Sequence, residues 1–318
     1  MPETPRWLIT KNRDDDAKGI LTQLYPEGFD VDSVIADIKE SIERDTAAEH
    51  SFGWDIVFKP TPAFRRIMVV GVGMAVSQQA VGIDAIQYFL IDILDKSGVT
   101  GQLQQTLILI FLGIVKLAFI VVGGKLFDRK GRRPLFFTSL VGMFIALMMV
   151  AFNFLGESSN SGFSVFALAL YLAMFSIGIG PGAWLVPAEV FPTCIRAKAM
   201  SVATFSNRLT ATIMASTFLS TANAISYAGF FFLLSAICVV CFAFLYIFLP
   251  ETKGRSLEDM SLYFAEITGD RSVLEAEQQI QRGLRQGGGG GDGGGIQMGS
   301  STTAGTRPPT GVEESEII

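Results

Sequence analysis

The residues of this sequence that could do chemistry are polar side chains inside an apolar stretch. Residues 67–91 are long enough to cross a bilayer, and they contain Gln78, Gln79, Asp84, Gln87 and Tyr88. Polar groups at that depth are costly. They therefore mark either a binding site or hydrogen bonds between helices. Amide, carboxylate and phenol groups suit a ligand covered in hydroxyl groups, and the density of the cluster favours a ligand site over helix joining.

The angular positions of these side chains depend on whether the helix is continuous. On an ideal helix four of the five fall within about half of the circumference, whereas Gln78 lies outside that arc. A break near Gly82 would bring Gln78 round to the others. Broken helices at mid-membrane are one way in which transporters expose polar groups to a substrate. We therefore expect an interruption at Gly82.

Two cations lie in other apolar stretches. Lys116 precedes Asp128 by twelve residues, about 18 Å along a helix, so it should face a partner or a wet cavity. A retinal Schiff base explains it poorly, because the chain has six apolar stretches and Lys116 is not in the last. Arg208 must also pair or reach water. Its neighbour Asn207 could equally join helices or contact a ligand.

A glycine- and proline-rich segment, Gly178–Gly182, lies within the fourth apolar stretch and is followed by Trp184 and Pro187. Pro181 removes a backbone donor, and the glycines let the helix bend. Trp184 offers a flat apolar surface with one N–H donor. It could stack on a ring, although packing is the simpler interpretation of this residue alone.

Six apolar stretches must position these groups. The mean hydropathy is +0.42, and charged residues make up 17% of the chain, against about a quarter in soluble domains. A membrane-spanning helix needs about 20 apolar residues. The stretches are 67–91, 103–127, 134–155, 162–187, 199–224 and 227–249. We predict an all-α membrane protein with six transmembrane helices.

Lysine and arginine concentrate on one side of the predicted bundle, and this bias sets its orientation in the membrane. On the opposite side, the connecting segments contain only Lys96. The basic side comprises the two ends of the bundle and the connections after the second and fourth stretches, with Arg65, Arg66, Arg129, Lys130, Arg132, Arg133, Arg196, Lys198, Lys253 and Arg255. Both termini are therefore expected in the cytosol. Met1 is followed by no basic segment and cleavage site, so we expect no signal peptide.

The ends of the chain read as soluble. Residues 1–64 are expected to form a cytosolic linker with two short amphipathic helices between residues 13 and 48, leaning on the bundle, which spans 65–250. Residues 251–285 should contain a helix opened by a capping box at Ser256. Residues 286–318 are glycine-rich and read as a disordered tail. Its last residues, Glu313–Ile318, weakly resemble a sorting signal, but low complexity is the simpler explanation.

Several functional classes are disfavoured by composition. Three cysteines cannot build a disulfide framework, and the single histidine, His50, lies in a charged segment. We expect no metal site, no cofactor and no nucleic-acid partner. No nucleophile–base pair is visible either, so an enzyme is the weakest hypothesis.

Five motifs, in order and at matching places, resemble the C-terminal half of the sugar porter family of the major facilitator superfamily. Within that family the chain is most similar to the plant-type polyol and monosaccharide proton symporters. The motifs are Pro2–Leu8, Gln78–Asp84 with Tyr88, Asp128–Arg133, Gly178–Trp184 with Pro187–Pro192 and Arg196, and Pro250–Arg255. The resemblance runs from Pro2 to about Phe264. It implies a bundle of two inverted three-helix repeats.

The resemblance also implies residue roles. It assigns the sugar site to Gln78, Gln79, Asp84, Tyr88, Trp184 and Asn207. Tyr88 would line or gate that site and Trp184 would flank the sugar ring. It assigns a cytosolic ionic latch, which holds the outward-facing state, to Asp128, Arg129, Arg132, Arg133, Glu189 and Arg196. Without the resemblance these charges could be topology anchors only, although Glu189 among so many cations favours pairing.

The chain departs from the family pattern at a few positions. Asp84 replaces the asparagine of most sugar porters, although the polyol group shares the aspartate. Phe89 replaces a second tyrosine, and Arg208 replaces a tryptophan of many animal members. Lys116 is shared with plant-type relatives. These departures favour a proton-coupled polyol or monosaccharide carrier.

The resemblance further implies a partner, because the family builds carriers from two six-span halves and places the usual proton-accepting carboxylate in the first. This chain lacks that half. We expect Met1 to be an internal methionine of a longer protein, rather than the start of a half-transporter that dimerises. The predicted function is proton-coupled symport, or facilitated diffusion, of a monosaccharide or polyol in the plasma or vacuolar membrane. The alternative is a sugar sensor or regulatory subunit that binds without transporting.

Overall fold

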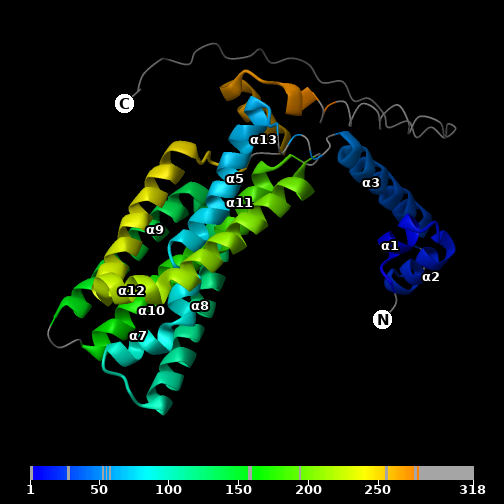
Figure 1. The fold of residues 1–318 in the computed structure, drawn as a ribbon. Coiled ribbons are helices and arrows are strands. Elements are labelled where there is room, and N and C mark those ends of the chain that lie inside the picture. Colours follow the sequence, from blue (N-terminus) through cyan, green and yellow to red (C-terminus); the bar gives the residue numbers. More distant parts are fainter. Residues whose placement is uncertain are drawn as a thin grey trace, which may run out of the picture.

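The computed structural model describes residues 3–26, 29–51, 54, 56, 59–156, 160–192, 195–254, 257–275 and 278, and every regular element in them is an α-helix (Figure 1). A small N-terminal unit contains α1 (Pro5–Thr10), α2 (Asp14–Leu24) and α3 (Val31–Ser51). The remaining helices form a long bundle. The prediction of an all-α membrane fold is confirmed.

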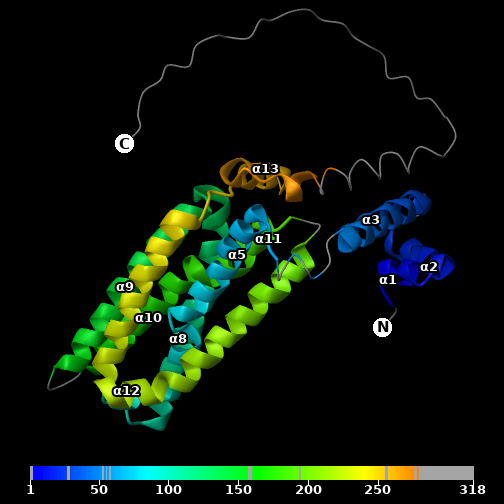
Figure 2. The same cartoon turned by 45° about the horizontal axis from the view of Figure 1, so that its top comes forward.

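The N-terminal helices cover their apolar faces with one another. Leu8 and Ile9 of α1 are buried against Ala17 and Leu21 of α2 and against Ile35 of α3. The sequence analysis missed α1, which begins where the side chain of Thr4 accepts a hydrogen bond from the backbone N–H of Trp7. Because this third helix completes a small core, α2 and α3 do not lean on the bundle as expected, and Figures 1 and 2 both show the unit standing away from it.

Five helical stretches are long and apolar enough to cross a membrane: Pro62–Tyr88, Gln102–Phe127, Arg132–Leu155, Ser161–Val190 and Arg196–Phe248. The first contains α5 (Pro62–Ala80) and α6 (Ile83–Tyr88), and α7 (Leu90–Lys96) follows it. The next two are α8 (Gln102–Lys130) and α9 (Arg132–Leu155). The fourth is divided into α10 (Ser161–Ile177) and α11 (Ile179–Val190), and the fifth is α12 (Arg196–Phe248).

Helix α12 covers two of the predicted spans. Its 53 residues would measure about 80 Å if straight, far more than the roughly 30 Å of a bilayer core. The chain turns back at Ser226, where φ is 76° and ψ is 161°. The Ser226 hydroxyl accepts a hydrogen bond from the N–H of Gly229 and so caps the second arm. Figure 2 shows the two arms meeting at the end of the bundle away from α13. It stays a prediction that the chain crosses the membrane six times and that the bundle consists of two inverted three-helix repeats.

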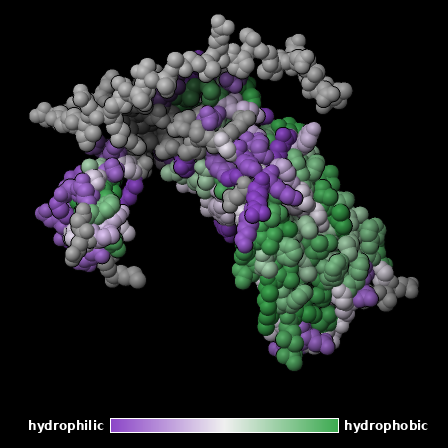
Figure 3. Space-filling view, turned by 180° about the vertical axis from the view of Figure 1, so that it is seen from behind, coloured by the Kyte–Doolittle hydropathy of each residue, from purple (hydrophilic) through white to green (hydrophobic). Residues whose placement is uncertain are grey.

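The helices of the bundle are covered to very different degrees. α12 packs against α9 and α5, and α10 packs against α9 and α8. Packing is close at Gly182 of α11, where an added Cβ would come within 2.1 Å of the Phe136 ring. Only 11% of the apolar window of α8 is buried, which leaves Leu107, Ile114 and other large side chains exposed. Figure 3 shows the resulting hydrophobic surface along the bundle.

Helix α13 (Leu257–Thr268) contacts α5 and α11 at one end of the bundle. Its start agrees with the expected helix, although the capping residue Ser256 lies outside the described residues. Asp270, just after α13, accepts a hydrogen bond from the Ala63 N–H in the first turn of α5. We call this end, which also carries Arg66, Arg132 and Lys253, the basic end.

Candidate functional site

The candidate site is built around the interruption expected at Gly82. Helix α5 ends at Ala80 and α6 starts at Ile83, and Gly82 between them has φ of +87°, a conformation that side chains other than glycine rarely adopt. The Val81 carbonyl accepts a hydrogen bond from the Tyr171 hydroxyl of α10 at 3.0 Å. The break is therefore present, and a buried tyrosine holds it in place.

Three amide side chains meet beside this break, and we call them the amide cluster: Gln78, Gln79 and Asn207. The Asn207 side-chain N–H donates to the Gln78 carbonyl oxygen at 2.8 Å and to the Ala75 backbone carbonyl at 2.7 Å. The Gln79 amide donates to Asn207 Oδ1 at 3.4 Å. The Gln78 amide donates to the Gly180 carbonyl of α11 at 2.7 Å. The cluster thus joins α5, α11 and α12.

The amide cluster is closed in this structure. Asn207 is fully buried, and Gln78 and Gln79 are exposed by only 7% and 3%. In this structure these amides form hydrogen bonds between helices, as the helix-joining alternative predicts. One acceptor is left over, because Gln79 Oε1 is buried without a hydrogen-bond partner among the described atoms. Such an atom is costly to bury and is open to a ligand donor.

Of the other three predicted sugar contacts, Tyr88 and Trp184 are exposed and Asp84 is half-buried. Tyr88, at the end of α6, is 71% exposed, and Trp184 of α11 is 38% exposed. The Asp84 carboxylate lies 3.9 Å from the Arg208 guanidinium of α12. The structure therefore brings together three of the six predicted residues directly and leaves the others on accessible surface.

Lys116 of α8 has the partner that its depth requires. Its ammonium group donates to Gln87 Oε1 of α6 at 3.2 Å. It also lies close enough to Asp84 to interact with it electrostatically. A row of polar groups thus links α8, α6 and the first arm of α12, with the carboxylate of Asp84 between two cations. We call Asp84, Gln87, Lys116 and Arg208 the polar row.

At the basic end, one predicted latch pair is formed. The Arg132 guanidinium donates to Glu189 Oε1 from both Nε and Nη2, at 3.1 and 2.7 Å. Arg133 and Arg196 instead donate to the backbone carbonyls of Tyr246 and Phe191. Arg129 is exposed, and the side chain of Asp128 lies outside the described residues.

Two further residues, Glu251 and Thr252, bond to the predicted latch residues and were not predicted from the sequence. The Glu251 carboxylate accepts hydrogen bonds from the backbone N–H groups of Arg132 and Arg133 at the start of α9, each at 3.2 Å. The Thr252 hydroxyl donates to Glu189 Oε2. Glu251 lies two residues after the last apolar stretch, at the end of the bundle where the cationic loop is expected. This position could have predicted its contacts with that loop.

Comparison with known proteins gives a consistent result. The family described as "Sugar (and other) transporter" matches residues 1–264. "Probable polyol transporter 4" of Arabidopsis thaliana is 33% identical over 267 residues, 83% of this chain and 51% of the relative. "Polyol transporter 5" of the same plant is 35% identical over 83% of this chain and 53% of the relative. "Facilitated trehalose transporter Tret1" of Aedes aegypti is 34% identical over 82% of this chain and 32% of the relative.

Solved structures agree with the family match. The proton:xylose symporter XylE bound to 6-bromo-6-deoxy-D-glucose aligns with a TM-score of 0.64 and 25% identity, over 83% of this chain and 55% of that one. The inward-open conformation of XylE from E. coli aligns with a TM-score of 0.67 and 25% identity, over 83% and 52%. The chain spans about half the length of these relatives.

Proposed function

Since the chain belongs to the sugar porter family of the major facilitator superfamily, we propose that it supplies one half of a carrier for a monosaccharide or polyol. The carrier works by alternating access, and a second six-span half forms the opposite wall of the site. The observation that carries this proposal is the amide cluster, in which buried amides of α5 and α12 bond to one another and to a backbone carbonyl of α11, beside the break after α5.

The chemistry of the amide cluster fits a polyhydroxylated ligand. Each amide offers both donors and an acceptor, and each sugar hydroxyl does the same. In the closed arrangement the amides satisfy one another. A ligand would exchange these bonds for its own, with Gln79 Oε1 as the acceptor already free. Because the same bonds join α5, α11 and α12, ligand binding is coupled to the positions of those helices.

Proton coupling is the second element of the proposal. The Asp84 carboxylate lies 3.9 Å from the Arg208 guanidinium of α12 and near Lys116 of α8, and its oxygens are hydrogen-bond acceptors. Asp84 is then a fixed acceptor for a sugar hydroxyl, and the carboxylate that takes up the proton belongs to the other half. We further propose that both termini and the basic end face the cytosol of a plasma or vacuolar membrane, because lysine and arginine concentrate there.

The latch is expected to act at the basic end. The Arg132–Glu189 pair and the contacts of Glu251 and Thr252 tie α9 and α11 to the segment after α12. We propose that this latch holds the outward-facing state and breaks as the two halves rock against each other. Such rocking is one established form of domain motion in transporters.

The proposal is tested by uptake in a protein that joins this chain to a six-span N-terminal half. Asn207→Ala should lower uptake of the preferred sugar or polyol by at least about tenfold, the effect of losing about 1.4 kcal/mol of binding. Labelled sugars and polyols would be compared with and without a pH gradient. Asn153→Ala is the matched control. The side-chain amide of Asn153 also joins two helices, through a partly buried hydrogen bond to Ser164, but it lies outside the cluster.

Three results would contradict parts of the proposal. Equal losses in the Asn207 and Asn153 variants, at equal surface expression, would mean that the amide cluster is structural only. Uptake at the same rate with and without the pH gradient would contradict proton coupling. Ligand binding to the reconstituted protein without flux into vesicles would support the sensor alternative.

A further inference from the structure

A pocket of about 490 Å³ lies at the basic end, away from the amide cluster. It is enclosed by the first turns of α5, the last turn of α12 and the end of α13. Arg65, Arg66 and Val69 contribute from α5, and Phe248 and Ile267 contribute from α12 and α13. The pocket therefore combines two cations with an apolar wall.

In the described part of the chain, neither arginine has an acidic partner. Among the described side chains, no carboxylate lies within 4.0 Å of either guanidinium group. The Arg66 guanidinium lies over the Phe248 ring, 4.5 Å from its centroid. The N–H groups of the same helix end are already in use, because Ala63 donates to Asp270 and Phe64 donates to Thr61 Oγ1. An anion in this pocket would therefore be bound by the guanidinium groups and not by the helix terminus.

The apolar wall indicates which kind of anion fits. α5 changes from charged to apolar directly after Arg66, so the pocket lies where the polar boundary of a bilayer meets its core. Val69 and Ile267 are exposed on its rim. A soluble phosphate needs only the cations, whereas a phospholipid needs cations for its phosphate and apolar surface for its acyl chains. We propose that this pocket binds an anionic phospholipid of the adjoining leaflet.

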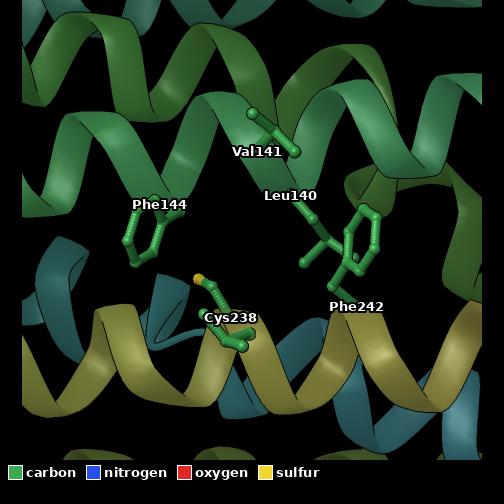
Figure 4. A pocket seen from close by; sticks show the side chains of 6 residues that line it. Leu140, Val141, Phe144, Cys238 and Phe242 are labelled. Carbon is green, nitrogen blue, oxygen red and sulfur yellow. The ribbon is translucent and has the colours of Figure 1, made fainter.

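A second pocket shows what the arginines add. It lies between α9 and the second arm of α12, has a volume of about 170 Å³, and is lined by Leu140, Val141, Phe144, Cys238, Val239 and Phe242 (Figure 4). Its walls carry no charged or amide group, so it can hold an acyl chain but cannot select a headgroup. Of these two pockets, the one with Arg65 and Arg66 is therefore the one that can select a headgroup.

The test measures lipid retention by the full chain, purified in detergent, with native mass spectrometry. Phosphatidylglycerol and phosphatidylcholine with identical acyl chains are titrated in parallel. We expect one phosphatidylglycerol to be retained preferentially. Arg65→Gln and Arg66→Gln should each weaken it roughly fivefold, and the double variant roughly 25-fold. The matched control is Lys125→Gln with Lys130→Gln, which removes two exposed cations of α8 outside the pocket and should change retention little.

A charge-neutral variant separates the pocket from a diffuse basic surface. Val69→Phe fills the space without changing charge, and it should also weaken retention. Equal retention of both lipids would overturn the proposal. So would equal losses in the arginine and lysine double variants, or unchanged retention in Val69→Phe. Displacement of the lipid by millimolar inorganic phosphate would assign the pocket to a soluble anion instead.

Discussion

At the scale of single residues, Asp84 is the position where charge matters most. Its carboxylate is the one acidic group of the polar row, where it lies near the cations Lys116 and Arg208. The contact between Asp84 and Arg208 is long, and the Arg208 side chain is 59% exposed, so this ion pair contributes little to stability. The interaction with Lys116 is the more important one, because a lysine inside an apolar helix is costly without compensation.

This balance predicts the outcome of a charge-removing substitution. Asp84→Asn should lower the yield of folded protein, because Lys116 loses its compensating charge while keeping its hydrogen bond to Gln87. Adding Lys116→Met should restore much of the yield. Fluorescence-detected size-exclusion chromatography of tagged variants measures this. If the double variant is no better than Asp84→Asn alone, the two residues are not coupled.

At the scale of elements, the start of α9 depends on Glu251, a residue that follows α12 and is distant in the sequence. The carboxylate of Glu251 takes the place of an N-cap for this helix, accepting the N–H groups of Arg132 and Arg133. Gly131, the actual N-cap residue, has no side chain to do so. A negative group at a helix N-terminus is also favoured by the helix dipole.

Removal of this carboxylate should loosen α9 locally. Glu251→Ala should cost about 1 kcal/mol, the usual effect of losing a cap. Hydrogen exchange of the first amides of α9 should accelerate, while the middle of the helix stays protected. Glu266→Ala, which removes an exposed carboxylate from α13, serves as the control. Unchanged exchange at Arg132 and Arg133 in the Glu251 variant would show that the cap is dispensable.

At the scale of the whole molecule, the C-terminal segment is attached to the bundle through Asp270. Desolvation alone would raise the pKa of Asp270, but hydrogen bonds from the backbone of Ser272 and Ala63 and from the hydroxyls of Ser272 and Thr61 outweigh it, and the pKa lies below its ordinary value of 3.8. The ionised form is therefore the one that favours attachment. Its contribution is present above that ordinary value and is lost as the pH falls through the lowered one.

The prediction is that attachment is insensitive to pH near neutrality and weakens only in strong acid. Asp270→Asn should reproduce the acid behaviour at pH 7, because the amide is a weaker acceptor for the Ala63 N–H. Hydrogen exchange at Ala63, measured across pH with correction for intrinsic rates, reports the contact directly. Weakening of the wild-type contact between pH 5 and pH 7 would contradict the assignment.

The sequence predicted the helices and the break better than it predicted the contacts. The break near Gly82 was suggested because it would bring Gln78 round to the other polar groups, and Lys116 was singled out because a cation inside an apolar helix demands a partner. The hydrogen bonds of the amide cluster were not predictable, since they depend on how α5 approaches α12 and α11. The residues of α1 gave too short a pattern to be recognised as a helix, whereas the reversal at Ser226 falls between the predicted stretches 199–224 and 227–249.

The fold-back of α12 has a consequence for biogenesis. Its two arms meet at Ser226 with hardly any connecting segment. No hydrophilic stretch is then available to cross the bilayer ahead of the second arm. We expect the arms to leave the translocon together as one hairpin, so that shortening the apolar length of either arm impairs insertion of both.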